Sequence, residues 1–210
     1  MNENWTNDTN LPKDWLALLQ VRTLNSYQTL AAAIDAEDAY TRGHSQRVAV
    51  FAANLAKQAG LSRAQIDVVF RAGTIHDIGK IMIPPEILKK PTDLTDEEHL
   101  VMAQHPVLGE HLVRELGGAE ELLPGVRSHH EAYDGSGYPD GLVGESIPLI
   151  ARVLTLADTF DAMTSDRPYR PGLTVEEAIT VILRESGRQF DPELGPIFAD
   201  MMANSRQKAA

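Results

Sequence analysis

Five histidines and two aspartates stand out in this sequence because the residues around them are apolar and follow a helical pattern. Any one of them could be a hydrogen-bonded core histidine or a solvated carboxylate. Together they are costly to bury, because every unpaired imidazole or carboxylate in a helical core is destabilising. Bound metal ions would supply the missing partners. The seven residues are His44, His76, Asp77, His105, His129, His130 and Asp158.

The adjacent pair His76 and Asp77 constrains how such a centre could be built. Neighbouring residues on a helix point about 100° apart, so the pair can act together only at a helix end, or by facing two metal ions. A bridging Asp77 would achieve the second arrangement. The chain has no cysteine, so thiolate ligands and disulfides are excluded. Nitrogen and oxygen donors favour iron or manganese, with zinc, nickel and magnesium as alternatives.

Composition limits the remaining choices. With 210 residues and 43% hydrophobic content, the chain can bury one substantial core, so we expect a single domain with a short extension. The net charge of -11 argues against non-specific binding to nucleic acid or to an anionic membrane. No apolar run approaches the roughly 20 residues that span a bilayer, and the polar start does not resemble a signal peptide. We expect a cytoplasmic protein.

Apolar residues recur mostly at steps of three and four, which predicts an all-α fold. An amphipathic helix is expected over residues 14–35, before all the polar motifs. Three capping boxes predict helix starts, because a hydroxyl and a Glu or Gln three residues later satisfy exposed N–H groups. These boxes are Ser62 with Gln65, Thr95 with Glu98, and Thr174 with Glu177.

Other signals place the remaining elements. Helices are expected over residues 44–59, before Gly60, and from Leu108 to the stop at Gly117. A further helical segment is expected over residues 120–133, followed by the only long loop, residues 134–146, which is rich in glycine. A strongly apolar helix should cover residues 148–164. The last helix should begin at Asp191, with Pro192 in its first position.

Ordered motifs make the chain similar to a known family. They are YTRGHSQR at 40–47, HDIGK at 76–80, HP at 105–106, HHEAYDGSGYP at 129–139 and ADTFDAMTSDRPYR at 157–170. This series resembles the HD-GYP branch of the HD phosphohydrolase superfamily. The resemblance implies an HD-type helical bundle with a glycine-rich GYP loop. It covers residues 36–210 as the catalytic domain, and leaves residues 1–35 as an N-terminal helical extension.

The resemblance also implies roles for individual residues. The seven His and Asp residues match the family's metal ligands, with Asp77 as the bridge. Where some members have a third-metal glutamate, this chain has Tyr40, so we favour two metals. Asp161 is expected to orient a ligand. Lys80 would stabilise charge on the attacked phosphate, and the substrate would be bound by Arg167, Arg170, Gly137, Tyr138 and Pro139. A surface role stays open for Arg170, and the loop could merely cover the bundle.

The implied activity is hydrolysis of cyclic di-GMP to pGpG, GMP or both. Two metal ions would activate water and stabilise both the attacking and the leaving oxygen, so no protein nucleophile is needed. One alternative is an HD phosphohydrolase acting on another nucleotide or on a hybrid cyclic dinucleotide. Another is a catalytically silent module that binds the messenger or a GGDEF domain. The resemblance implies GGDEF proteins as partners, through the GYP loop. The apolar stripe of residues 14–35 could either pack on the body of the domain or pair with a second copy of the chain.

Overall fold

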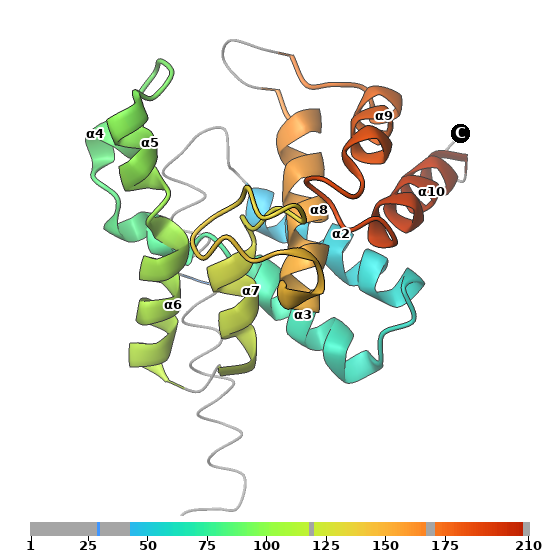
Figure 1. The fold of residues 1–210 in the computed structure, drawn as a ribbon, viewed down its shortest axis with the longest axis horizontal. Coiled ribbons are helices and arrows are strands. Elements are labelled where there is room, and N and C mark those ends of the chain that lie inside the picture. Colours follow the sequence, from blue (N-terminus) through green and yellow to red (C-terminus); the bar gives the residue numbers. More distant parts are fainter. Residues whose placement is uncertain (1–28, 30–42, 118–119, 167–170, 208–210) are drawn as a thin grey trace, which may run out of the picture.

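The computed structural model describes residues 29, 43–117, 120–166 and 171–207, and within them the fold is helical, as predicted. Outside the helices, these residues contain one isolated bridge, between Ser186 and Phe190. Figure 1 shows the arrangement. The α-helices are α2 (His44–Gln58), α3 (Arg63–Ile75), α4 (Pro85–Leu88), α5 (Asp96–Met102), α6 (His105–Leu116), α7 (Leu123–Ser128), α8 (Leu149–Thr164), α9 (Val175–Glu185) and α10 (Leu194–Gln207), and the 3₁₀ turns are η1 (Ile78–Met82), η2 (Glu120–Leu122) and η3 (Gly144–Ser146).

Local hydrogen bonds set several helix starts. All three predicted capping boxes form, and they open α3, α5 and α9. The Asp191 carboxylate accepts hydrogen bonds from the backbone N–H groups of Glu193 and Leu194, at 2.8 and 3.1 Å. It therefore caps the start of α10, although regular helix begins at Leu194, slightly later than predicted.

The core is built where α2, α3 and α8 meet, with α10 closing one side. Phe160 of α8 lies between Phe51 of α2 and Phe198 of α10, with ring centroids 5.3 and 5.2 Å apart. These edge-on contacts are the favoured geometry for aromatic pairs. At Gly73 of α3, an added Cβ would lie 2.8 Å from Cα of Ala49 in α2. Glycine thus permits the close crossing that brings the ends of α2 and α3 together.

The helix predicted over residues 120–133 was wrong at its end. Helix α7 stops at Ser128, so His129 and His130 lie in the turn that follows it. The hydroxyl of Thr155 in α8 donates to the His129 carbonyl at 2.8 Å, and the Tyr133 N–H donates to the Gln189 carbonyl at 3.1 Å. Partners on distant segments replace the bonds that would have continued the helix.

One segment projects from the bundle. Helices α4 and α5 contain no buried residue, and both lie within residues 81–104, which we call the arm. Figure 1 shows them at one edge, away from α8, α9 and α10. The arm leaves the bundle directly after Lys80 and returns to it at His105, so both of its ends touch the site described below.

Two predicted features cannot be compared with the structure. Apart from Thr29, the amphipathic helix predicted over residues 14–35 lies outside the described residues, as does the rest of the predicted extension.

Among the helices that are described, none has the length and apolar character required to cross a bilayer.

Candidate metal centre

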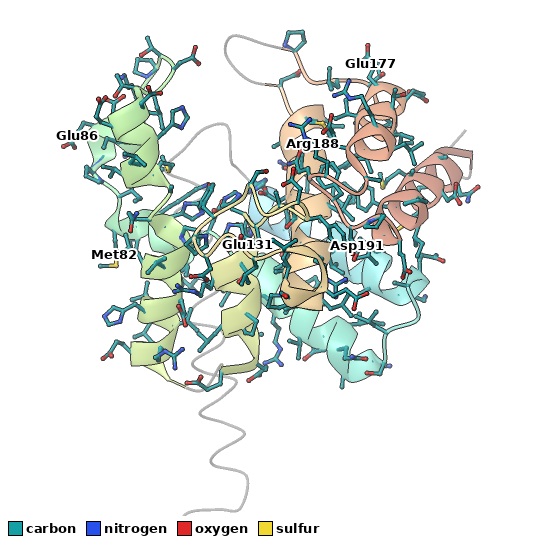
Figure 2. All side chains as sticks on the ribbon, viewed as in Figure 1. Met82, Glu86, Glu131, Glu177, Arg188 and Asp191 are labelled. Atoms are coloured by element: carbon teal, nitrogen blue, oxygen red, sulfur yellow. The ribbon has the colours of Figure 1, made fainter. Side chains whose placement is uncertain are left out.

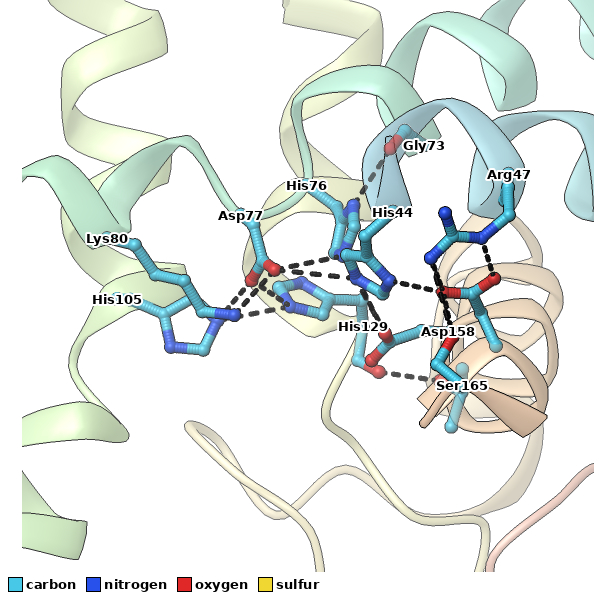
Figure 3. Close-up of polar contacts among 12 residues, drawn as sticks. His44, Arg47, Gly73, His76, Asp77, Lys80, His105, His129, Asp158 and Ser165 are labelled. Carbon is cyan, nitrogen blue, oxygen red and sulfur yellow. Dashed lines mark hydrogen bonds and ion pairs between the residues drawn. The ribbon is translucent and has the colours of Figure 1, made fainter. Parts of the chain in front are cut away.

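The structure brings the seven predicted His and Asp residues together, and most of them lie at helix ends. His44 is the first residue of α2, His76 closes α3, and His105 opens α6. The exception is Asp158, which extends from the middle of α8. Figure 3 shows how these ends converge. A helix end frees the side chain from the regular helical surface, which lets neighbouring residues such as His76 and Asp77 point at one centre.

Asp77 joins two groups of potential ligands. One group consists of His44, His76 and Asp77, and the other of Asp77, His105, His129 and His130. Oδ2 of Asp77 faces the first group, 3.7 Å from Nε2 of His44 and 3.4 Å from Nε2 of His76. Oδ1 faces the second group, 3.1 Å from Nε2 of His105 and 3.9 Å from Nε2 of His129. Each oxygen of this carboxylate therefore serves a different group.

Asp158 extends the first group. Its Oδ1 lies 3.2 Å from Nε2 of His44 and 3.8 Å from Nε2 of His76. Burial alone would raise the pKa of Asp158, but the hydrogen bond from His44, with the charges of the surrounding imidazoles, holds it well below its usual value. The carboxylate is therefore ionised, as a ligand must be.

The outer nitrogens of the histidines determine which atoms face the centre. Nδ1 of His76, His105 and His129 each lies 2.8 Å from the backbone carbonyl three residues earlier. A carbonyl can only accept, so each Nδ1 carries the proton and each Nε2 presents a lone pair. This pattern is typical of histidines that bind metal through Nε2.

The donor set fits a cation. Nε2 of His105 and Nε2 of His129 are 3.3 Å apart, so two lone pairs face each other. Within the described part of the chain, His76 Nε2 and Asp77 Oδ1 are buried without a hydrogen-bond partner. Such groups are destabilising unless something pairs with them. Divalent cations held by the two groups would give these atoms partners, so the clusters are compatible with a metal site.

Burial controls the protonation of the second group. It lowers the pKa of His129 well below its usual value, and the neighbouring imidazoles of His130 and His76 lower it further. The pKa of His130 falls to about 3, again mainly because of burial. Both side chains are neutral at pH 7, which is the form that binds metal.

His44 has a different electrostatic environment. Burial lowers its pKa, but hydrogen bonds to Asp158 and Asp161 outweigh burial and raise the pKa to about 10. A metal ion at this position would displace that proton. Asp161 lies 2.8 Å from Nδ1 of His44 through Oδ2, and Arg47 donates to both of its oxygens, at 2.6 and 2.9 Å. Arg47 and Asp161 thus fix the orientation of the imidazole.

Lys80 lies directly beside the shared carboxylate. Its Nζ is 2.6 Å from Oδ2 of Asp77, and 23% of its side chain is exposed. Burial by itself would raise the pKa of Asp77, but the charge of Lys80 is the first of the effects that hold it well below its usual value. The ammonium is therefore within reach of both the centre and solvent.

The GYP loop, residues 134–146, covers the second group of ligands. The ring of Tyr138 stacks on the ring of His130, with centroids 4.9 Å apart and planes 27° apart. Burial raises the pKa of Tyr138, and the charges of Asp77 and Asp158 raise it further, so the phenol stays protonated. The peptide bond between Tyr138 and Pro139 is cis. This loop therefore holds an aromatic ring and a hydroxyl donor next to the centre.

Comparison with known proteins identifies the fold family. The family model described as HD domain matches residues 28–194. The chain belongs to the HD domain family. A cyclic di-GMP phosphodiesterase response regulator, RpfG from Xanthomonas campestris, is 41% identical over 179 residues, covering 83% of this chain and 47% of the relative. The resemblance to HD-GYP proteins predicted from the motifs is thereby confirmed.

Other relatives have a different named substrate. The 3'3'-cGAMP-specific phosphodiesterase 3 of Vibrio cholerae is 37% identical over 160 residues, covering 76% of this chain and 35% of the relative. A solved cyclic GMP-AMP-specific phosphodiesterase from V. cholerae superposes with a TM-score of 0.67 at 23% identity, covering 88% of this chain and 49% of that chain. This likeness shows the HD fold. The chain spans less than half the length of both curated relatives.

Sequence reasoning missed several residues of this HD domain. Arg47 lies inside a recognised motif, but nothing local indicates that it pairs with Asp161 on α8. Glu131 follows the histidine pair, and 2% of its surface is exposed. Its carboxylate accepts hydrogen bonds from the backbone of the GYP loop. Its position directly after two candidate ligands was the only available signal. The predicted substrate residues Arg167 and Arg170, together with Tyr40, lie outside the described residues.

Proposed function

We propose that this chain is a metal-dependent phosphodiesterase that hydrolyses cyclic di-GMP. The observation that carries the proposal is the placement of Asp77, whose two oxygens face two separate groups of ligands. Carboxylate-bridged pairs of cations are a recurring solution for displacement at phosphorus. The curated cyclic di-GMP phosphodiesterase that is 41% identical supports the choice of substrate.

Two divalent cations would be held by the seven clustered residues. The first would bind His44, His76, Asp77 and Asp158, and the second Asp77, His105, His129 and His130. When bound, the cations supply a water of lowered pKa and positive charge that stabilises the phosphorane-like transition state. Donors that are all nitrogen and oxygen favour iron or manganese over softer alternatives.

The remaining roles belong to the chain's own side chains. The Lys80 ammonium, 2.6 Å from Asp77, would stabilise negative charge on a phosphate placed between the two groups of ligands. Tyr138, Gly137 and Pro139 would form one wall of the substrate site, with the Tyr138 hydroxyl as a donor. Arg167 and Arg170 would bind the other phosphate of the cyclic dinucleotide, because a guanidinium donates to two phosphate oxygens at once.

The proposed catalytic unit is residues 36–210, preceded by an N-terminal extension over residues 1–35. We extend the proposal to protein partners. The GYP loop carries an exposed edge at Ser136 and Asp140, which would face a GGDEF domain. The amphipathic pattern over residues 14–35 would support a homodimer.

A second substrate is also supported. The relative that is 37% identical acts, by its name, on 3'3'-cGAMP. Both dinucleotides carry the same two phosphates, and the groups described at this site would contact phosphate. Activity on the hybrid dinucleotide is therefore the second candidate function.

One experiment tests both substrates. The protein is purified anaerobically, its metal is quantified by elemental analysis, and turnover of cyclic di-GMP and of 3'3'-cGAMP is followed by chromatography. We expect about two iron or manganese ions per chain, cleavage of cyclic di-GMP to pGpG or GMP, and loss of both metal and turnover in Asp77→Asn. Asp67→Asn is the matched control, because Asp67 is an exposed carboxylate on α3. Full metal occupancy without turnover of either dinucleotide would refute the proposal.

A further inference from the structure

One buried carboxylate beside the centre is not directed at it. Glu131 follows His129 and His130 directly in the chain, but it is absent from the two groups of ligand atoms found among the described residues. Oε1 accepts the N–H of Asp140 at 2.8 Å, and Oε2 accepts the N–H of Leu142 at 3.0 Å. Figure 2 shows Glu131 close to the GYP loop. Both oxygens are therefore committed to the loop.

These two bonds satisfy a need that the loop cannot meet by itself. A segment without regular structure has no internal ladder for its N–H groups, and each group that is left unpaired is destabilising. Glu131 thus binds the loop through the N–H groups on both sides of Gly141, just after Pro139.

The loop also passes very close to the ligand segment. The Tyr138 N–H donates to the His130 carbonyl at 3.2 Å. A Cβ added at Gly137 would lie 2.2 Å from the backbone nitrogen of Ala132. Glycine alone permits this approach, so the position of Tyr138 over His130 depends on how the loop is held against residues 130–132.

We propose that Glu131 is a positioning residue: by binding the N–H groups of Asp140 and Leu142, it holds the GYP loop so that Tyr138 stays stacked on His130. The consequence for catalysis rests on the proposed phosphodiesterase function. Glu131 acts through Tyr138, so it affects substrate binding and leaves the metal ligands in place.

Glu131→Gln tests this role with little change in size. The amide keeps one acceptor but turns a donor toward the second loop N–H. We expect hydrogen exchange at Asp140 and Leu142 to accelerate about tenfold in the metal-loaded protein, and KM for cyclic di-GMP to rise about tenfold. We expect metal content and kcat to change little. Glu177→Gln is the matched control: Glu177 also accepts a backbone N–H, from Thr174, but on distant α9 (Figure 2). Its KM and loop exchange should equal those of the wild type.

A double variant separates positioning from general stability. If Glu131 acts through Tyr138, the KM of Glu131→Gln combined with Tyr138→Ala should match that of Tyr138→Ala alone. A double variant whose KM is raised by the product of the two single effects would overturn the proposal. Unchanged hydrogen exchange at Asp140 and Leu142 in Glu131→Gln would also overturn the proposal. So would loss of metal from this variant while hydrogen exchange in the loop stays slow. Faster loop exchange in a protein that turns over neither dinucleotide would support the positioning of the loop and refute only the proposed function.

Discussion

Two segments leave the candidate metal centre and return to the bundle, and they are stabilised in opposite ways. The arm, residues 81–104, contains two helices, but neither helix buries a residue. The GYP loop contains only a short 3₁₀ turn, yet it is anchored to the body of the protein. Glu131 accepts the N–H groups of Asp140 and Leu142, Arg127 of α7 binds the carboxylate of Asp140, and the carbonyl of Arg188 accepts the N–H of Asp134 at 2.8 Å.

The difference follows from where backbone groups find their partners. In α4 and α5 the backbone hydrogen bonds join residues three or four apart, and the capping box of Thr95 and Glu98 closes the start of α5, so these groups find their partners within the arm. An irregular loop must find partners on other elements, and every partner ties it to the bundle. The segment with less regular structure is therefore the one suited to position a side chain at the site. The arm instead exposes apolar side chains, such as those of Met82 and Leu100.

The largest effect should come from Lys80, where the arm begins. Lys80→Met removes the ammonium beside Asp77, and we expect kcat to fall about a hundredfold or more, because one charge that stabilises the transition state is lost. Metal content should be retained, since lysine is not among the clustered ligands. Steady-state kinetics with elemental analysis measure both quantities. Lys57→Met, at the exposed end of α2, is the control. A change in KM alone would mean that Lys80, like the GYP loop, acts on substrate binding and not on the transition state.

A smaller effect is expected at the outer anchor of the loop. Arg127 donates to both oxygens of Asp140 at 2.8 Å and to Glu110 at 2.5 Å, and 32% of its side chain is exposed. Arg127→Gln should raise KM by less than about threefold and lower Tm by about 2 °C, because partly exposed ion pairs contribute little. The effect should shrink in high salt.

Arg114→Gln provides the control for this anchor. Arg114 also binds Glu110, at 2.8 Å, but its other partner is Glu120 and not a residue of the loop, and 53% of its side chain is exposed. Its KM should equal that of the wild type. If Arg127→Gln raised KM more than Glu131→Gln, the exposed ion pair would be the main anchor, and the buried carboxylate would be secondary.

The smallest effect should be in the arm itself. Thr95→Ala removes the capping box of α5, which weakens that helix locally by about 1 kcal/mol. Because α5 buries nothing, we expect global Tm to change by less than about 1 °C. Thr174→Ala removes the same motif from α9, which buries Ala178 and Ile182, so Tm should fall by about 2–4 °C. Thermal unfolding measures both, and equal shifts would show that the arm is part of the cooperative unit.

Much of the fold was accessible from local pattern. The capping boxes at Ser62, Thr95 and Thr174 form as predicted, because all of their partners lie within three residues. The clustering of the candidate ligands could be predicted for another reason: histidines in apolar helical surroundings need partners. The end of α7 could not be predicted, since the bonds that replace it come from Thr155 and Gln189.

Local sequence therefore indicated most of the helices and the residues that could carry the chemistry. Tertiary structure decided how those residues face one another. The bond between Asp161 and His44 joins residues 117 positions apart, and the bond between Thr155 and His129 joins residues 26 apart. The division of Asp77 between two groups of ligands likewise depends on four helix ends meeting. Local spacing cannot encode such contacts, because they exist only after the helices have packed around their shared apolar core.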